Sequence, residues 1–374
     1  MVFILITLTE NHIIVTTTAT QVSIQNPGEL MSKTVLITGG AGFIAHHVID
    51  RILKSTDWNI VSLDRLDYSG NLNRLHHMMM THNEQTRKRV KIVYHDLKAE
   101  INPQTRSMIG KVDIIMHLAA GSHVDRSIEF PMEFVMDNVV ATCNILNYSR
   151  TINNLERFIY FSTDEVFGPA PEGVFYKEYD RYNSTNPYSA AKAGGEELAV
   201  AFENTYKLPI YVTHTMNVFG ERQHPEKYIP MCIKKVRDGE TITVHSDSSR
   251  TIPGSRHYIH AADVADAMMF LLDLKDFVMP PEFGGAKCPK FNIVGKQEIN
   301  NLDLANIIAR SQSKELKYEM VDFHSSRPGH DLRYSLSGDF MRSLGWEPRI
   351  DLTERISQVV EWTLANEDWL TINA

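Results

Sequence analysis

Apolar runs and helical patterns alternate along most of the chain. Residues 34–37 form a β-favouring run, and after a glycine-rich stretch Val48, Ile49, Ile52 and Leu53 recur at helical spacing. Further strand-like runs follow at residues 59–63, 91–94, 113–118, 157–162 and 209–213. Strands that alternate with helices are typical of an α/β fold with a doubly wound parallel sheet, and the pattern predicts this fold class.

Both ends of the chain depart from this alternation. Residues 1–31 contain an apolar run of about seven residues, far short of the roughly 20 that span a bilayer. We expect this part to be a poorly ordered extension, with an unusual signal peptide as the alternative. Residues 32–215 are predicted to form a dinucleotide-binding domain, to which a segment near 255–275 returns. The proline-interrupted residues 216–374 are predicted to form mainly a smaller, substrate-binding lobe.

Composition excludes several classes of function. Of the 374 residues, 43% are hydrophobic and 22% are charged, as in an ordinary soluble globular protein. A formal net charge of −8 without a basic face argues against nucleic acid as a partner, and no membrane partner is expected. Cys143, Cys232 and Cys288 are scattered, which indicates neither a disulfide framework nor a zinc site and is typical of a cytoplasmic protein without a metal centre.

A glycine-rich turn joins the first strand to the first helix. Glycines at residues 38–44 let backbone N–H groups approach a pyrophosphate, and the N-terminus of the following helix adds its partial positive charge. Asp64 ends the next strand, about 20 residues beyond the turn, where a carboxylate accepts hydrogen bonds from a ribose and repels a 2′-phosphate. A Rossmann-like NAD site is therefore predicted, and a solvated Asp at a strand end is the alternative.

Two pairs of residues carry candidate chemistry. Asp164 and Glu165 follow the strand at residues 157–162, and Tyr188 and Lys192 lie four residues apart, on one face of a predicted helix. A lysine ammonium favours the tyrosine phenolate, which can then take a proton from a sugar hydroxyl. An acid and a base beside such a pair predict elimination as well as redox chemistry. An exposed acidic turn and a chance Tyr–Lys spacing are the alternatives.

The loop after the strand at residues 113–118 is small and polar. Residues 119–127 could face a ligand, or could be an ordinary loop in which Ser122 caps the next helix. Spacing alone favours neither interpretation.

From about residue 33 to 349 the chain resembles the extended short-chain dehydrogenase/reductases, and most of all the nucleotide-diphosphoglucose 4,6-dehydratases. The most specific match is the triplet Thr163, Asp164 and Glu165. The other matching stretches are residues 38–44, 66–72, 122–127, 166–168, 225–227 and 327–331, together with Tyr188 and Lys192.

This resemblance implies an enzyme, a hydro-lyase, that borrows and returns the hydride of its substrate. Tyr188, supported by Lys192 and Thr163, would deprotonate the C4 hydroxyl of dTDP-glucose or UDP-glucose while NAD accepts the C4 hydride. Glu165 would then remove the C5 proton as base, and Asp164 would protonate the departing C6 hydroxyl as acid. Hydride return to C6 would give a 4-keto-6-deoxy sugar nucleotide. Such compounds are intermediates in the biosynthesis of deoxysugars such as rhamnose.

The resemblance also implies binding residues and an assembly. The NAD-binding residues would be Gly39, Gly42, Phe43, Ile44, Asp64, Asp96, Leu97, Ala119, Tyr188 and Lys192. The sugar nucleotide would be held by Ser122, Asn217, Lys227, Arg222, Arg256 and His330, with Arg327 as a neighbour. Predicted helices at about residues 130–149 and 186–206 would pair across a homodimer, although their apolar faces could equally be buried within one chain.

Some positions depart from the family pattern. Ala45 and Ala141 stand where glycines are usual, Gly121 replaces a common Glu or Gln, and residues 220–224 differ from the loop of dTDP-glucose enzymes. The choice between thymine and uracil therefore stays open. A sugar-nucleotide 4-epimerase or decarboxylase, or a non-catalytic NAD-binding sensor, are the alternative functions.

Overall fold

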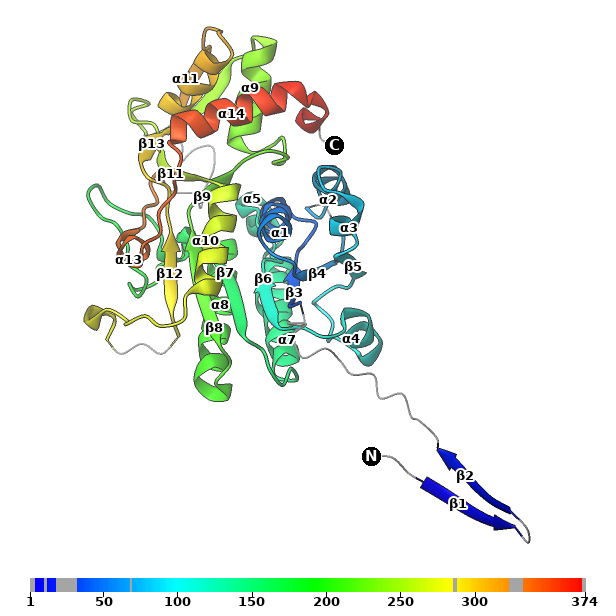
Figure 1. Cartoon of the computed structure of the whole chain (residues 1–374). Helices are drawn as coiled ribbons and strands as arrows, with labels where there is room; N and C mark the ends of the chain where they lie inside the picture. The colour runs from blue at the N-terminus through cyan, green and yellow to red at the C-terminus, as the bar shows by residue number, and fades with distance from the viewer. Residues whose placement is uncertain are drawn as a thin grey trace. The chain divides into compact units, whose positions relative to one another are not determined.

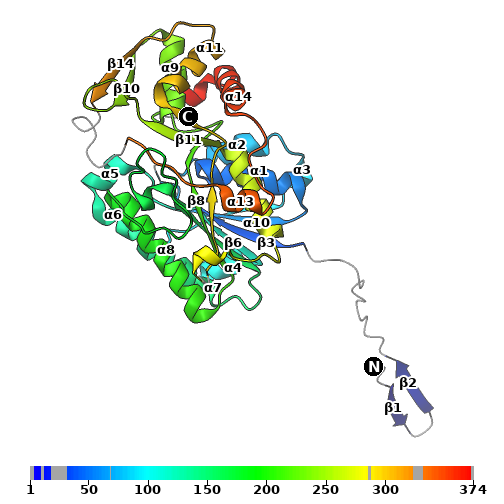
Figure 2. The same ribbon diagram turned by 90° about the vertical axis from the view of Figure 1, so that its left-hand side faces the viewer.

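The computed structural model describes residues 4–9, 12–17, 32–67, 69–284, 288–322 and 332–371 (Figures 1 and 2). The chain divides into two compact units, residues 1–32 and 33–374. In the first, β1 (Ile4–Thr9) and β2 (His12–Thr17) pair as an antiparallel hairpin. The sequence pattern did not predict this hairpin, and the rest of the expected extension lies outside the described residues.

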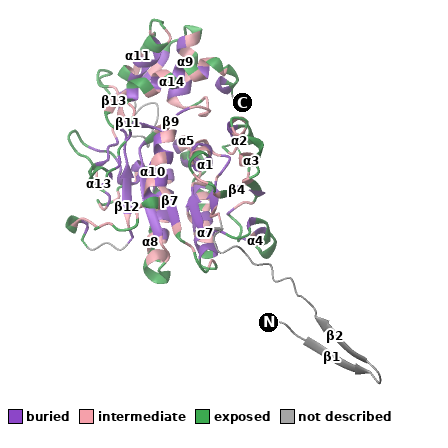
Figure 3. Cartoon of the chain, in the orientation of Figure 1, coloured by how far each residue is buried: buried purple, intermediate pink, exposed green. Residues whose placement is uncertain are grey.

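A seven-stranded parallel sheet forms the centre of the second unit. Its strands other than the edge strand β5 (Val90–Tyr94) are largely buried on both faces, which explains why they appear in the sequence as apolar runs without alternation (Figure 3). In spatial order they are β12 (Lys290–Ile293), β8 (Ile210–Thr215), β7 (Arg157–Thr163), β6 (Ile114–His117), β3 (Thr34–Thr38), β4 (Asn59–Asp64) and β5.

Helices cover both faces of this sheet. Val35 and Ile37 of β3 point into one core, formed with α1 (Phe43–Ser55), α10 (Ala261–Asp273) and α13 (Asp339–Ser343). Leu36 points into the opposite core. Helices α4 (Pro103–Ile109), α7 (Ala141–Ser149) and α8 (Pro187–Tyr206) contribute to that second core. The predicted doubly wound α/β class, Rossmann-like, is confirmed.

Shorter elements border the carboxyl ends of the strands, except for α3 (Glu84–Arg87), which leads into the amino end of β5. They are α2 (Leu72–Met79), α3, α5 (Val124–Glu129), α6 (Pro131–Val135), the π-helical turn η1 (Met136–Val140) and the 3₁₀ turn η2 (Asp164–Phe167). The single helix expected over residues 130–149 is thus interrupted by η1. Asn138, inside this turn, accepts from the Gly121 N–H (2.8 Å) and donates to the Gly121 carbonyl (3.0 Å). A π turn spaces side chains differently from an α-helix and commonly occurs at functional sites.

The smaller lobe has a third core of its own. It contains α9 (Tyr228–Asp238), α11 (Asn301–Ser311), α14 (Leu352–Ala365) and the 3₁₀ turn η4 (Glu367–Leu370), which stand together in Figure 1. Its strands are β9 (Asn217–Phe219), β10 (Ile242–Ser246), β11 (Ser255–His260), β13 (Glu298–Asn300) and β14 (Tyr318–Asp322), and η3 (Pro281–Phe283) lies between α10 and β12. No helix of the described residues is both long and apolar enough to cross a membrane.

The boundary predicted at residue 216 is less clean than the sequence suggests. Helix α10 packs with α1 on one face of the sheet, and β12 pairs with β8 within it. The pattern did not indicate β12 because Lys290 and Asn292 are polar, yet both are buried. Lys290 pairs with Glu196 (2.9 Å), and the Asn292 N–H donates to Glu178 (3.1 Å). These partners lie far away in the sequence.

Candidate active site

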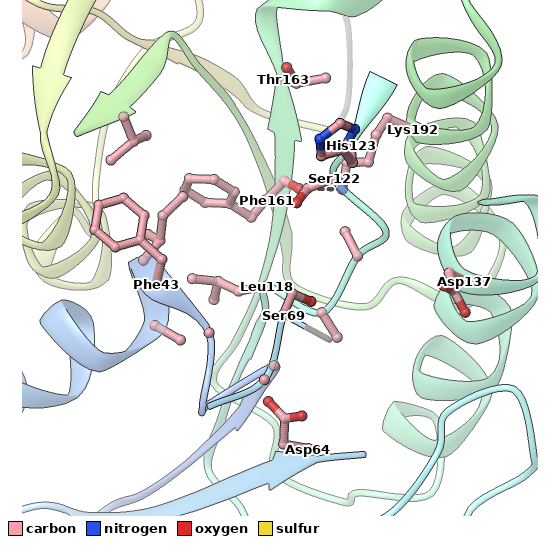
Figure 4. A pocket seen from close by; sticks show the side chains of 18 of the residues that line it. Phe43, Asp64, Ser69, Leu118, Ser122, His123, Asp137, Phe161, Thr163 and Lys192 are labelled. Carbon is pink, nitrogen blue, oxygen red and sulfur yellow. Dashed lines mark hydrogen bonds between the residues drawn. The ribbon is translucent and has the colours of Figure 1, made fainter. Parts of the chain in front are cut away.

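A cavity of about 370 Å³ opens where the carboxyl ends of the strands meet the smaller lobe. Figure 4 shows Thr163 and Lys192 toward one end of this pocket and Asp64 toward the other. Most of the predicted site residues line it: Gly39, Gly42, Phe43, Ile44, Asp64, Asp96, Leu97, Ala119, Ser122, Thr163, Asp164, Glu165, Tyr188, Lys192, Asn217 and Lys227. Residues from seven segments of the sequence therefore meet in one place.

The glycine turn fits a dinucleotide pyrophosphate. Gly39 has φ +67°, and a Cβ there would lie 2.8 Å from the backbone of Ala119. A Cβ on Gly42 would lie 2.8 Å from the Gly39 carbonyl. Because Gly42 is the N-cap of α1 and has no side chain, the first N–H groups of this helix are left for a ligand. Gly39 and Gly42 with the start of α1 would thus hold the pyrophosphate of NAD.

Asp64 ends β4 beneath this turn. Its carboxylate accepts from the Ala41 N–H (3.0 Å) and the Leu66 N–H (2.8 Å). Burial raises the pKa of Asp64, and the bonds from these two N–H groups oppose the rise. Gly70 passes so close that a Cβ there would lie 2.6 Å from Asp64 Oδ1. The loop after β4 therefore wraps the carboxylate at the edge of the cavity, where a ribose can reach it.

Thr163 fixes the position of the acidic pair. It is the last residue of β7 and the N-cap of η2. Its Oγ1 donates to Asp164 Oδ1 (3.0 Å) and accepts from the Glu165 N–H (3.4 Å). Asn186 Nδ2 donates to Glu165 Oε2 (3.2 Å). Asp164 Oδ2 is buried and has no hydrogen-bond partner among the described residues, so this oxygen is available to a proton or a substrate group.

The environment of the pair raises the pKa of both carboxyl groups toward neutral pH. Burial raises the pKa of Asp164 to about 6 and that of Glu165 to about 7. The neighbouring Asp164 charge adds to the rise at Glu165, whereas Arg256 and Lys227 oppose it. Two interacting carboxyl groups lose their protons in separate steps, so one proton is shared by the pair near neutral pH. An acid and a base are then available side by side.

Tyr188 and Lys192 stand one turn apart near the start of α8. Asn186 caps this helix by accepting from the Ser189 N–H (2.8 Å). Lys192 Nζ donates to the carbonyl of Phe161 (2.6 Å), and burial lowers the pKa of Lys192 to about 7. Its side-chain amino group can therefore gain or lose a proton in the physiological pH range.

A lowered tyrosine pKa is expected from Lys192 together with a positively charged nicotinamide, whereas the groups of the chain alone act in the opposite direction. Burial and the Glu165 charge raise the pKa of Tyr188 above its ordinary value, while a hydrogen bond from Thr163 opposes the rise. The sequence shows the Tyr–Lys spacing but neither the burial of the phenol, which is the main cause of the rise, nor the two carboxyl groups that add to it.

Several predicted substrate contacts lie elsewhere. Arg222 does not line the cavity, because its Nε donates to His77 Nδ1 (3.0 Å) and its guanidinium lies 4.8 Å from the ring centre of Trp362. Arg256 donates to the Leu332 carbonyl (2.5 Å), and its charge lowers the pKa of both Asp164 and Glu165 from a distance. His330 and Arg327 lie outside the described residues.

Ser122 lines the cavity and does not cap the next helix. The N-cap of α5 is His123, whose Nδ1 accepts from the Arg126 N–H (3.4 Å). The alternative interpretation of this loop, with Ser122 as the cap, is therefore wrong.

Other residues of the cavity wall are not indicated as site residues by the sequence pattern, among them Arg65, Asp67, Arg74, Asp137 and Phe161. Arg65 directly precedes residues 66–72, which carry only the resemblance to the family, and Asp67 lies within that stretch. Arg74 is buried on α2 and donates to the Ser69 carbonyl (2.7 Å), and nothing in the helical pattern marks it. Asp137 reaches the cavity from the π turn, which an α-helical pattern cannot indicate.

Comparisons with known proteins agree with this site. A family model described as GDP-mannose 4,6 dehydratase matches residues 36–359. A dTDP-D-glucose 4,6-dehydratase of Mus musculus is 33% identical over 348 residues, which cover 91% of each chain. A trifunctional UDP-glucose 4,6-dehydratase of Arabidopsis thaliana, which also carries epimerase and reductase activities, is 34% identical over 340 residues. These cover 90% of the present chain but 48% of the relative, so the chain spans about half of that protein.

Solved structures give the same result. A dTDP-glucose 4,6-dehydratase of Streptomyces venezuelae, crystallised with NAD, has a TM-score of 0.76 and 30% identity, covering 90% of this chain and 98% of its own. A UDP-glucose 4-epimerase of Thermus thermophilus, at 24% identity and a TM-score of 0.73, shows the shared fold alone. NAD in such relatives agrees with the predicted cofactor. The chain therefore belongs to the nucleotide-sugar 4,6-dehydratase family of extended short-chain dehydrogenase/reductases, as its sequence motifs predicted.

Proposed function

We propose that the chain catalyses the NAD-dependent dehydration of a nucleotide-diphosphoglucose, dTDP-glucose or UDP-glucose, to the 4-keto-6-deoxy sugar nucleotide. The observation that carries this proposal is the acidic pair Asp164 and Glu165. Both carboxyl groups have a raised pKa and line one cavity with Tyr188, Lys192 and the glycine turn. An elimination needs a base and an acid in such an arrangement.

In the first step Tyr188, as phenolate, takes the proton of the sugar C4 hydroxyl. Bound NAD supplies a hydride acceptor at C4, a positive charge that favours the phenolate, and later the hydride for C6. Lys192, held at the Phe161 carbonyl, adds a second positive charge when it is protonated. Thr163 is placed to hydrogen-bond the same substrate oxygen, since its hydroxyl already reaches toward Tyr188.

Elimination follows because the C4 ketone acidifies the C5 proton. Glu165 removes this proton, and the electron pair of the C5–H bond forms the C5–C6 double bond. The proton that the pair shares lies on Asp164 when Glu165 acts as base, although the pKa of Glu165 is the higher of the two, and Asp164 donates this proton to the C6 hydroxyl, which leaves as water. When hydride returns to C6, Glu165 gives its proton back to C5. The proton that Tyr188 took from the C4 hydroxyl then replaces the one that Asp164 gave to the water, so the chain regains its starting protonation state and no net oxidation occurs.

The substrate would be held by residues of both lobes. Ser122 follows β6, Asn217 begins β9, and Lys227 is the N-cap of α9, and all three line the cavity. Arg256 would act through its charge, and His330 would complete the set. The relatives named above act on dTDP-glucose and UDP-glucose, so both nucleotides are candidates here.

A 4-epimerase, a decarboxylase or an NAD-binding sensor would leave features of this cavity without a role. None of these functions needs a buried carboxylate oxygen that lacks a hydrogen-bond partner in the described chain, as Asp164 Oδ2 does. None needs a neighbour whose pKa is raised to about 7, as at Glu165.

We also propose a homodimer and a cytoplasmic location. Ile128, Met132 and Val135 expose apolar side chains beside η1, on elements that pack against α8. Large exposed apolar side chains that cluster favour an interface. Free thiols at Cys143, Cys232 and Cys288 suit a reducing compartment.

The function is tested by incubating the protein and NAD separately with dTDP-glucose, UDP-glucose and UDP-N-acetylglucosamine. Loss of one water is followed by mass, and the 4-keto product by its absorbance in alkali. We expect dehydration of at least one glucose nucleotide. An isomer of unchanged mass would indicate an epimerase, and loss of carbon dioxide from a uronic acid nucleotide would indicate a decarboxylase.

A further inference from the structure

Asp64 is followed directly by an arginine, Arg65, and both side chains line the cavity. In Rossmann-like sites an acidic residue at this place holds the 2′-hydroxyl of NAD, whereas an arginine nearby accommodates the 2′-phosphate of NADP. The two adjacent residues therefore favour opposite cofactors. Their relative influence depends on what the Arg65 guanidinium contacts.

The guanidinium of Arg65 donates its hydrogen bonds to carboxylates. Nη1 and Nη2 donate to the two oxygens of Asp137 (2.5 and 2.8 Å), a bidentate pair. Nε donates to Asp67 (2.5 Å), and Asp96 lies 3.8 Å from Nη1. Bidentate pairs of this kind are among the strongest and most directional hydrogen bonds in proteins. The bond to Asp137 raises the pKa of Arg65.

Asp137 is held rigidly in this position. It belongs to η1, and its neighbour Asn138 is bonded through its side chain to both backbone groups of Gly121. Thr142 Oγ1 also donates to the Asn138 carbonyl (2.6 Å). Figure 4 shows Asp137 on its helix at the right of the pocket, and Asp64, the last residue of β4, at the bottom. The carboxylate that binds Arg65 therefore does not depend on a flexible loop.

We propose that Asp137, assisted by Asp67, masks Arg65 and thereby makes the cavity selective for NAD over NADP. This inference rests on the proposed NAD site. A 2′-phosphate carries nearly two negative charges. It would meet the carboxylates of Asp64, Asp67, Asp96 and Asp137 at this edge of the cavity, and Arg65, which follows Asp64 directly, is already paired.

The test uses the full chain and measures the dissociation constants of NAD and NADP by calorimetric titration. In Asp137→Ala we expect NADP to bind roughly tenfold more tightly than in the parent, as one regained charged hydrogen bond would allow. NAD affinity should change by less than about threefold, because the ribose contact at Asp64 remains. Asp137→Asn retains the size of the side chain and should give a smaller gain in the same direction.

Two controls separate masking from general electrostatics. Asp266→Ala removes an equal charge from an ion pair with Arg51 on the surface, and NADP affinity should stay unchanged. Adding Arg65→Ala to Asp137→Ala should abolish the gain, because the freed guanidinium is its cause.

The outcomes distinguish this inference from the proposed function. A parent protein that binds NAD, with variants whose NADP affinity does not change, would overturn masking alone. An equal gain in the double variant would overturn it too, since Arg65 would then be irrelevant. A correctly folded parent that binds neither nucleotide would overturn the NAD site and masking together.

Discussion

Replacing Glu165 by Gln should stabilise the protein while it removes the proposed base. Glu165 is largely buried, and its pKa rises from the ordinary 4.5 to about 7. At about 1.36 kcal/mol for each pKa unit, ionised Glu165 costs the folded state about 3 kcal/mol. Gln has nearly the same shape, carries no charge, and can still accept from Asn186 Nδ2.

The sign of the effect sets its pH dependence. A carboxyl group whose pKa is raised by folding favours the folded state at low pH, and this contribution is lost as pH rises through the folded value. Glu165→Gln should therefore be more stable than the parent by about 3 kcal/mol at pH 8.5. This advantage should shrink by about 2 kcal/mol at pH 5.5, where the folded parent is mostly protonated.

Urea unfolding followed by tryptophan fluorescence at the two pH values measures this difference. The denaturant slopes must agree between parent and variant for the comparison to hold. Glu197→Gln, an exposed position on α8, is the matched control and should change stability by less than about 0.5 kcal/mol at either pH. A variant that is less stable than the parent, or an advantage independent of pH, would refute the reasoning.

The remaining predictions concern chemistry and binding. Glu165→Gln should still oxidise C4, so a single turnover should accumulate NADH absorbance without loss of water; dehydration near the parental rate would show that another group is the base. Gly39→Ala should weaken NAD binding at least about tenfold, because the new methyl group enters the pyrophosphate turn at positive φ; unchanged affinity in a titration would contradict the proposed turn. Arg222→Ala should leave KM within about twofold while lowering stability by about 1 kcal/mol, because its guanidinium stacks on Trp362. Lys227→Ala, at the cavity, should instead raise KM. Equal KM values for these two variants would contradict the conclusion that Lys227, and not Arg222, contacts the substrate.

Local patterns predicted the fold and the centre of the site because local physics determines them. A glycine turn between a buried strand and a helix has few structural alternatives, and Thr163 ends its strand and caps the next turn through its own hydroxyl. The Tyr188 and Lys192 spacing likewise follows from helical geometry alone. These features need no knowledge of distant partners.

Features that depend on distant partners were not predicted. Arg222 was expected at the substrate because arginine suits phosphate, but a positive φ of 64° and the partners His77 and Trp362 direct its side chain elsewhere. The raised pKa of Tyr188 comes first from burial and then from the carboxyl groups of another element. In both cases the residue type suits the expected chemistry, but tertiary contacts determine where the side chain lies or what its pKa is.

A second buried carboxylate shows that the raised pKa values at the acidic pair do not follow from burial alone. Glu196 lies one turn beyond Lys192 on α8 and is fully buried. Its oxygens contact Lys290 Nζ (2.9 Å), His214 Nε2 (3.1 Å) and the hydroxyl of Tyr182. Although burial alone would raise it, these partners hold the pKa of Glu196 well below its ordinary value.

The same fold therefore satisfies one buried carboxylate completely, while Asp164 and Glu165, at the cavity, have fewer partners. Structural carboxylates gain stability from paired charges, whereas an acid and a base must keep atoms available for protons that move. Supplying Asp164 and Glu165 with cations as close as those of Glu196 would lower both pKa values and leave no proton on the pair near neutral pH. The destabilising environment of the pair is thus the condition under which it can work as acid and base.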